Sequence, residues 1–335
     1  MTPATTTPHH IICLEEVHCP IPTSSFTFAH TNTRYASTPP SLQEIISRLK
    51  DATIAITTIV PITREVLDAC PRLKCVLVMA TGVEWVDKRA FQERGVKVIN
   101  CPGANVSSVA EHAIALYFAA RRGVVRMHNL VMGSDEWQVK RTLVHRFGNG
   151  ESTGRPPHTT QQEVVAIIGY GAVGKRIEGI CRALGMQVLI AERKGRIGME
   201  VRGGRVEFDV AVKRATVVVL AVSKTEETVG LIGEEELKGM RGEAVLVNVA
   251  RGGIVDEKAL VRALREGWIA AAATDVFDGE PPVRGQSVLL EQDVPNLTVS
   301  PHIAWFSEST MRNLQDLLVE GVEGFVSGNL VNVVC

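Results

Sequence analysis

The glycine-rich segment Gly169-Tyr-Gly-Ala-Val-Gly174 restricts the possible folds of this chain more than any other stretch. A β-rich apolar run, Val164–Ile168, leads directly into it, and a helical pattern follows over residues 175–184. Between a strand and a helix, such glycines allow a tight turn, a close backbone approach to a pyrophosphate, and close helix packing. The amino end of the helix then faces the anion. We therefore predict a dinucleotide-binding turn with contacts from Gly169, Gly171, Ala172, Val173 and Gly174.

The next β-rich run ends at an acidic residue, Glu192, twenty-three residues after Gly169. A carboxylate at this position can accept hydrogen bonds from the ribose hydroxyls of the cofactor. It would also repel a 2′-phosphate, and we therefore expect NAD rather than NADP. Arg193, a further predicted cofactor contact, and Lys194 follow directly. Turned inward, these two side chains could accommodate that phosphate, so the sequence leaves NADP use open.

Short apolar runs alternate with helical patterns from end to end, which predicts an α/β fold with parallel sheets covered by helices. Strand candidates lie at residues 11–14, 53–60, 75–80 and 97–100, and again at residues 164–168, 187–191, 216–222, 244–249, 269–274 and 297–300. A chain of 335 residues exceeds what one hydrophobic core normally serves. We therefore expect two domains. A Rossmann-type doubly wound sheet over residues 104–303 would bind NAD, and a smaller flavodoxin-like α/β domain, residues 1–103 with 304–335, would bind the substrate.

The sequence predicts the secondary structure of three further segments. Residues 106–132 form one candidate helix, longer than is usual in globular proteins and suited to a spine between domains. Residues 148–162 are rich in Gly, Pro, Ser and Thr and predict an exposed loop. Residues 308–326 have helical spacing and are expected to return to the first domain.

The balance of charges favours a small-molecule partner. Lys and Arg together number 36 and Asp and Glu 37, a formal net charge of -1, so no overall field attracts nucleic acid or anionic lipid. No apolar run approaches the ~20 residues of a membrane span, and the polar start lacks the features of a secretion signal. The seven scattered cysteines have no paired spacing typical of a metal or redox site. We expect free thiols, no metal, no nucleic-acid or membrane partner, and a cytoplasmic location.

Polar residues near the carboxyl ends of the predicted strands are the candidate catalytic residues, because ligands of open α/β sheets bind at that edge. Arg251, Asp275 and His302 lie at or just past such ends, and Glu280 lies five residues after Asp275. Hydride transfer at a secondary alcohol needs a group that takes up and returns the hydroxyl proton, which a histidine can do near neutral pH. A carboxylate would orient the ring, and an arginine would hold a substrate carboxylate and polarise its carbonyl.

Each of these residues also has an interpretation without catalysis. His302 could bond to backbone at a strand end, Glu280 could be an exposed turn acid, and Arg251 could cap a loop. Their joint presence beside a dinucleotide-binding turn favours a functional site.

Several segments resemble the signatures of the D-isomer-specific 2-hydroxyacid dehydrogenases. They are residues 169–174, 248–256, 273–281 and 300–305, with two further segments at residues 80–82 and 100–111. The likeness covers most of the chain in the right order and is far more specific than a glycine loop alone. It implies an NAD-dependent enzyme that interconverts a small D-2-hydroxy acid and its 2-oxo acid.

The resemblance implies a role for individual residues. His302 would be the acid and base, Glu280 would support it, and Arg251 would bind the substrate. Asp275 would contact the carboxamide of the nicotinamide, and Ala250 would be a further cofactor contact.

The resemblance also implies the substrate site and the assembly. Backbone amides around Ala80, Thr81 and Gly82 would hold the substrate carboxylate, together with Arg251 and His302. The active site would lie in a cleft between the domains. The chain would form a homodimer clasped through the long helix after residue 105.

Within the family, residues 80–82 and 302–305 look closest to glycerate dehydrogenases and hydroxypyruvate or glyoxylate reductases. Ile59 stands where relatives often carry a basic residue facing the substrate. Without that cation, a substrate with a second anionic group, such as a phosphate, is disfavoured.

Three alternative functions were weighed against this hypothesis. A formate dehydrogenase would resemble the fold but pair its histidine with an amide side chain, which Glu280 argues against. A corepressor-like scaffold, in which NAD binding promotes dimerisation, keeps the same residues and would be distinguished by a lack of turnover. A methyltransferase would leave Arg251 and His302 without a joint purpose.

Overall fold

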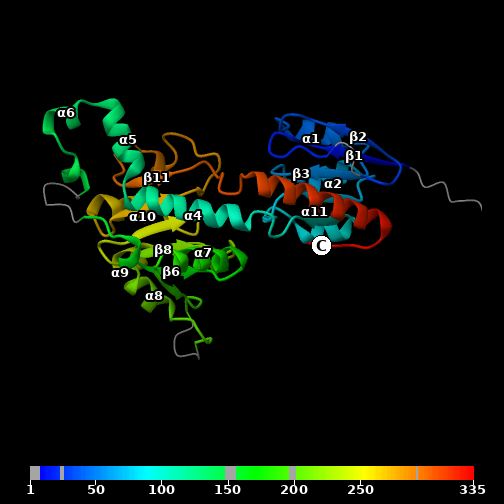
Figure 1. Ribbon diagram of the computed structural model, residues 1–335. Coiled ribbons are helices and arrows are strands. Elements are labelled where there is room, and N and C mark those ends of the chain that lie inside the picture. Colours follow the sequence, from blue (N-terminus) through cyan, green and yellow to red (C-terminus); the bar gives the residue numbers. More distant parts are fainter. Residues whose placement is uncertain (1–7, 23–25, 148–155, 196–200, 292) are drawn as a thin grey trace, which may run out of the picture. The chain divides into compact units, whose positions relative to one another are not determined.

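The computed structural model describes residues 8–22, 26–147, 156–195, 201–291 and 293–335. The chain divides into two compact units (Figure 1), close to the predicted limits at residues 103 and 303. Unit 1 contains residues 1–105 and 306–335, and unit 2 contains residues 106–305. Most of the predicted loop at residues 148–162 lies outside the described residues, apart from a short 3-10 helix, η2 (Thr160–Gln162).

Unit 1 is a parallel five-stranded sheet with helices packed on it. The strands are β1 (His9–Cys13), β2 (His30–Arg34), β3 (Ile54–Thr57), β4 (Cys75–Val78) and β5 (Lys97–Asn100), in the order β2-β1-β3-β4-β5. This is the flavodoxin-like order that we predicted. The helices are α1 (Leu42–Leu49), α2 (Arg64–Ala69), α3 (Lys88–Glu93) and α11 (Glu308–Ser327).

Helix α11 belongs to unit 1, although it is far from β4 in sequence (Figure 1). A Cβ at Gly321 would lie 2.8 Å from Leu77 Cδ1 and 3.0 Å from Ile99 Cγ2. A larger residue at this position would require the side chains of Leu77 and Ile99 to shift, so the glycine allows a close approach of α11 to β4 and β5. The predicted return of the chain to the first domain is therefore seen in the packing.

Strand β2 was not predicted from the sequence. Its residues, His30-Thr-Asn-Thr-Arg34, are polar, and β2 lies at the edge of the sheet, where it pairs with β1 alone. An edge strand can stay half exposed, so it need not carry the apolar run on which the prediction depended.

Unit 2 is a parallel six-stranded sheet in the order β11-β10-β9-β8-β6-β7. The strands are β6 (Val164–Ile168), β7 (Gln187–Ile190), β8 (Val217–Leu220), β9 (Val245–Asn248), β10 (Ala271–Thr274) and β11 (Leu297–Val299). From β6 the chain runs outward to β7 and then crosses back to β8 on the other side of β6. The switch point of this doubly wound sheet therefore lies between β6 and β8, where ligands bind in such folds.

Helices cover both faces of this sheet. Along β6, Val165 and Ile167 face α4 (Val106–Arg121) and α7 (Ala172–Ala183), whereas Ala166 and Ile168 face the other helices. Those helices are α8 (Phe208–Arg214), α9 (Glu234–Gly239) and α10 (Glu257–Glu266), and a 3-10 helix, η3 (Val288–Leu290), packs beside α10. Because both faces are buried, the strands are continuous apolar runs rather than alternating ones.

The long helix predicted for residues 106–132 is two helices. Helix α4 ends at Arg121 and α5 runs over Val124–Gly133, because Gly123 between them adopts a left-handed conformation with φ 56°. A left-handed residue interrupts an α-helix, and glycine adopts it without steric cost. Helix α6 (Glu136–Lys140) and the 3-10 helix η1 (Val144–Phe147) complete an arm that projects beyond the sheet (Figure 1). Among the described residues, no helix has the length and apolar character needed to cross a membrane.

Candidate active site

The glycine segment forms the turn between β6 and α7. Gly169 has φ 98°, and a Cβ there would lie 2.4 Å from the carbonyl oxygen of Ala221. A Cβ at Gly174 would lie 2.1 Å from Gly169 O, so these two glycines are required by the packing of the turn itself. Gly171 differs, because a Cβ there would meet no described atom within 4 Å. Its lack of a side chain leaves open space at the amino end of α7, as a phosphate-binding turn requires.

Glu192 lies directly after β7, at the same edge of the sheet, and is 3% exposed. Its Oε2 accepts a hydrogen bond of 2.7 Å from Arg202 Nε, and its Oε1 accepts one of 2.8 Å from the Arg193 amide. The hydrogen bonds from Arg202 oppose the effect of burial and hold the pKa of Glu192 at about 2. The carboxylate is therefore ionised at neutral pH.

Asp275 anchors the segment that carries His302. It follows β10, is 1% exposed, and accepts hydrogen bonds from Ser300 Oγ at 2.6 Å and from the backbone amides of Ile303 and Ala304 at 3.1 and 2.8 Å. Burial alone would raise the pKa of Asp275, but these bonds and one from His112 hold it below its ordinary value. The ionised carboxylate fixes the turn after β11 against the end of β10.

His302 and Glu280 form a hydrogen-bonded pair. The His302 Nδ1 atom lies 2.5 Å from Glu280 Oε2. An ionised carboxylate only accepts hydrogen bonds, so Nδ1 carries the hydrogen and Nε2 is the ring nitrogen left for proton exchange. Their side chains are 39% and 32% exposed, so a ligand can reach them.

The backbone of His302 is held in an unusual conformation. Its φ is 53°, in the left-handed region that residues other than glycine seldom adopt. The His302 amide donates to Asp275 O at 2.7 Å, and Trp305 Nε1 donates to His302 O at 2.8 Å. These bonds hold the strained residue, and such strain is characteristic of functional positions.

Glu280 is held from its other side by the protein backbone. Its Oε1 accepts a hydrogen bond of 2.9 Å from the Phe277 amide. Burial alone would raise the pKa of Glu280, but the hydrogen bonds from His302 and Phe277 and the charge of His302 hold it below the ordinary value. Glu280 is thus an ionised partner for the imidazole at neutral pH.

Arg251 lies in the turn after β9. Asn248 closes this turn, because its Oδ1 accepts from the Ala250 amide at 3.0 Å and its Nδ2 donates to Arg251 O at 3.2 Å. A Cβ at Gly252 would lie 1.6 Å from Phe277 O, so this turn packs backbone against backbone on the loop that carries Glu280. Arg251, Glu280 and His302 are therefore positioned by adjoining turns at the carboxyl ends of β9, β10 and β11.

The predicted substrate residues Ala80, Thr81 and Gly82 lie in unit 1, in the loop after β4. Thr81 Oγ1 donates to Cys101 O at 3.2 Å, and Asn100 Nδ2 donates to Thr81 O at 2.9 Å, which ties this loop to the end of β5. Among the described residues, no protein oxygen accepts a hydrogen bond from the amides of residues 80–82. These N–H groups are thus available to an anion.

Comparisons with known proteins identify the family of this chain. The model of the D-isomer specific 2-hydroxyacid dehydrogenase NAD binding domain matches residues 114–304. This chain belongs to the D-isomer-specific 2-hydroxyacid dehydrogenase family. It is therefore an NAD-binding oxidoreductase, as the sequence motifs predicted.

Relatives of this dehydrogenase include enzymes that act on small acids. A glycerate dehydrogenase from Methylorubrum extorquens is 38% identical over 92% of this chain and 93% of its own. A hydroxypyruvate reductase from Blautia hydrogenotrophica is 33% identical over 88% of each chain. The structure of a glyoxylate reductase from Paecilomyes thermophila has a TM-score of 0.77 and 23% identity and covers 98% of this chain and 99% of that chain, which shows a shared fold.

Two residues of this dehydrogenase's candidate site were missed at the sequence level. His112, on α4, lies with its Nε2 2.9 Å from Ser300 Oγ and 3.4 Å from Asp275 Oδ1, so these three side chains form one polar network. Ser300 lies within the motif at residues 300–305, but the prediction assigned a role only to His302 in that motif. The signal for His112 was a titratable side chain directly before the apolar run of residues 113–116 in the predicted helix.

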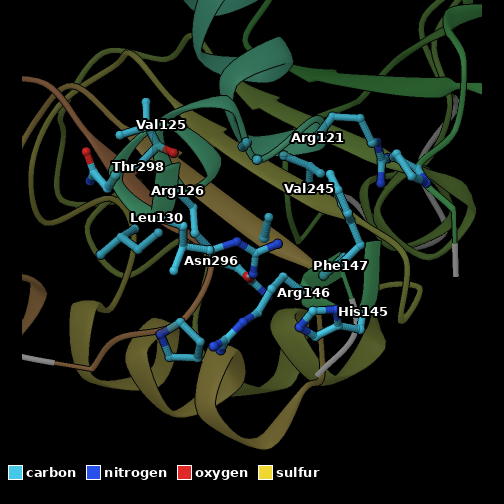
Figure 2. A pocket seen from close by; sticks show the side chains of 18 of the residues that line it. Arg121, Val125, Arg126, Leu130, His145, Arg146, Phe147, Val245, Asn296 and Thr298 are labelled. Carbon is cyan, nitrogen blue, oxygen red and sulfur yellow. The ribbon is translucent and has the colours of Figure 1, made fainter. Parts of the chain in front are cut away.

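A large open cavity of about 2060 Å³ lies elsewhere in unit 2 of the dehydrogenase (Figure 2). It is lined by the first residues of β9, β10 and β11 and by arm residues such as Arg126 and Leu130. These are the amino ends of the strands, whereas the glycine turn, Glu280 and His302 lie at the carboxyl ends. Because ligands of doubly wound sheets bind at the carboxyl ends, this cavity is not the candidate active site.

Proposed function

We propose that this protein is an NAD(H)-dependent dehydrogenase that interconverts a small D-2-hydroxy acid and its 2-oxo acid, of the glycerate, hydroxypyruvate or glyoxylate type. The observation that carries the proposal is the 2.5 Å contact of His302 Nδ1 with Glu280, at the same sheet edge as the glycine turn. Family membership and the named relatives support the substrate class.

The residues present fit a bound dinucleotide. The open space at Gly171 and the amino end of α7 suit the pyrophosphate, with Ala172 and Val173 in the first turn, and the ionised Glu192 suits the adenosine ribose. Asp275 Oδ2 accepts a hydrogen bond from the Ala304 amide, and a carboxylate oxygen can accept a second one, which leaves acceptor capacity for the nicotinamide carboxamide. Ala250 and Arg193 complete the proposed cofactor contacts. When bound, the nicotinamide supplies or accepts the hydride.

The protein's own groups transfer the proton and bind the charged group of the substrate. In reduction, Nε2 of the His302 imidazolium gives its proton to the carbonyl oxygen of the 2-oxo acid, and in oxidation the neutral ring takes the proton from the hydroxyl. Glu280 stabilises the imidazolium through Nδ1. Arg251 binds the substrate carboxylate and polarises the carbonyl. The amides of residues 80–82 are proposed substrate contacts on the ground of the family resemblance.

The substrate is expected to carry a single anionic group. Ile59, two residues after β3, is apolar and 55% exposed. The resemblance implies that this position faces the substrate, where a cation would be needed to hold a phosphate. We therefore expect hydroxypyruvate and glyoxylate to be preferred over 3-phosphohydroxypyruvate. The cytoplasmic location expected from the sequence is also part of this proposal.

The direct test follows NADH absorbance with hydroxypyruvate, glyoxylate, pyruvate, phenylpyruvate and 3-phosphohydroxypyruvate as separate substrates. Oxidation of NADH with the first two, and slower oxidation with the phosphorylated acid, is the expected result. Tight NADH binding without turnover of any of these acids would overturn the proposal and favour the corepressor-like scaffold.

The Glu280→Gln variant is expected to lower kcat for reduction by about 10- to 10²-fold, because a charge-assisted hydrogen bond contributes ~1.5–3 kcal/mol. The pKa of Glu280 lies below its ordinary value, so its charge is present across the neutral range and favours the imidazolium. Without that charge, the pH at which reduction falls to half its maximum should move to lower pH. Glu291→Gln, which removes an exposed carboxylate paired with Arg265, is the control. An unchanged pH profile in Glu280→Gln would contradict the supporting role.

We also propose that the enzyme is a homodimer held through the arm of α5 and α6. Helix α5 has no buried residue, and the arm exposes apolar side chains. They are Val124, Val125, Val131, Met132, Trp137, Val139 and Val144, which are 44% to 78% exposed. Exposed apolar surface gathered on one projecting segment is characteristic of a protein interface.

Light scattering during gel filtration tests the assembly. We expect about twice the chain mass of 36.4 kDa for the wild type and the mass of a single chain for Met132→Glu combined with Trp137→Glu. Val229→Glu, at an apolar residue that is 55% exposed in the same unit outside the arm, is the matched control. A wild type that elutes as a monomer would rule out this assembly.

A further inference from the structure

One arginine side chain, that of Arg202, pairs with the buried carboxylate of Glu192. The guanidinium of Arg202 meets both carboxylate oxygens, with Nε 2.7 Å from Oε2 and Nη2 bonded to Oε1. Such a two-point contact is the strongest pairing available to an arginine and a carboxylate. The Arg202 side chain is 46% exposed, so it is not enclosed by the protein.

Arg202 lies in a segment that is fixed to β7. The Glu192 amide donates to Val206 O at 2.7 Å, and the Val206 amide donates to Ile190 O at 2.9 Å. The Arg205 amide donates to Arg202 O at 3.0 Å, which closes the turn that carries Arg202. These backbone hydrogen bonds therefore place Arg202 beside Glu192.

Lys194, one of the two cations considered from the sequence, is engaged elsewhere. Its Nζ lies 2.6 Å from Glu236 Oε1 and 3.3 Å from Leu231 O. Arg193 is exposed and its amide, rather than its guanidinium, contacts Glu192. Among the described residues, Arg202 is thus the cation that the structure places on the carboxylate itself.

The pairing of Glu192 with Arg202 changes which cofactor can bind at the end of β7. An isolated carboxylate repels the 2′-phosphate of NADPH, whereas the ion pair of Glu192 and Arg202 has no net charge. The planar guanidinium can hold a phosphate through two N–H groups. The carboxylate oxygens still have lone pairs that can accept the ribose hydroxyls of NADH.

We propose that Arg202 enables this dehydrogenase to use NADPH as well as NADH, by neutralising Glu192 and binding the 2′-phosphate. The proposal rests on the proposed function in one respect, the position of the adenosine ribose at Glu192. It does not depend on which 2-oxo acid is reduced.

Fluorescence titration of the full-length protein with NADH and with NADPH tests the proposal without any substrate. We expect wild-type dissociation constants for the two cofactors that differ by less than about tenfold. In Arg202→Gln, the ratio of the NADPH to the NADH dissociation constant should rise by about 10- to 10²-fold, because charged hydrogen bonds to the phosphate are lost. Arg202→Lys should restore part of the ratio, since it keeps the charge but not the planar donor pair.

The matched control is Arg182→Gln. Arg182 is 56% exposed and pairs with Glu178 at the far end of α7, so its loss removes the same charge and should leave the ratio unchanged. A ratio that stays within twofold of the wild type in Arg202→Gln, or a wild type that discriminates more than a hundredfold against NADPH, would overturn the proposal. A shifted ratio without turnover of any 2-oxo acid would support the role of Arg202 while rejecting the proposed substrate class.

Discussion

The His302→Asn variant is expected to reduce hydroxypyruvate with a kcat about 10²- to 10⁴-fold below that of the wild type, because general acid and base catalysis contributes on this scale. Asparagine is the informative replacement. It tolerates the left-handed backbone conformation, so φ 53° at position 302 can be kept. Its amide can still donate to Glu280, so the carboxylate is not left unpaired. The loss then reports the missing proton carrier rather than a collapsed turn.

Two further measurements separate this effect from a structural one. The dissociation constant for NADH should stay close to the wild-type value, because the glycine turn and Glu192 lie on β6 and β7, away from the turn after β11. The part of the pH profile that comes from the ionisation of the acid should become flat, because no titrating group replaces the imidazole. A variant that keeps the wild-type kcat and pH profile would show that His302 is not the acid.

The central strands β6, β8, β9 and β10 were predictable from the sequence because they are buried on both faces. Val164–Ile168 forms β6 with the predicted limits, and its continuous apolar run leaves no other placement. By contrast, β2 has no such run, and the helix break at Gly123 depends on one left-handed residue. Glycines occur within helices as well, so the break could not be inferred from composition.

The hydrogen-bonded pair of Glu280 and His302 was predictable for a different reason. Glu280 and His302 were proposed because each follows a predicted strand, and parallel strands of one sheet bring their carboxyl ends to the same edge. The contacts that hold them were not predictable, since they join residues far apart in sequence. Examples are the close approach of Gly252 to Phe277 O and the bond from the Ala304 amide to Asp275.

The cation that pairs with Glu192 could not be predicted from the residues next to it in the sequence. The acid at the end of β7 was identified from its spacing, and the cations nearest in sequence were considered for the phosphate. The cation that the structure brings to Glu192 is ten residues away, on a segment that returns to pair with β7. The local motif identifies Glu192, but the path of the chain determines which cation pairs with it.

The Arg251→Met variant is expected to lose about 10²- to 10³-fold in kcat/KM for hydroxypyruvate, because two charge-assisted hydrogen bonds to the substrate are removed. Both kinetic parameters should change. KM should rise because the carboxylate loses a partner, and kcat should fall because the carbonyl is no longer polarised as negative charge develops on its oxygen. Methionine keeps the length and apolar stem of the side chain, so packing on the turn after β9 is largely preserved.

Arg251→Lys distinguishes charge from geometry at this position. Lysine keeps the positive charge but lacks the planar donor pair, so we expect it to recover only part of the lost kcat/KM. Arg241→Lys is the control, because Arg241 pairs with Glu243 just before β9, at the opposite end of the same strand. If Arg251→Lys matched the wild type, a point charge alone would suffice and two-point recognition of the substrate by Arg251 would be rejected. If Arg251→Met retained the wild-type kcat/KM, the substrate-binding role of Arg251 would be wrong.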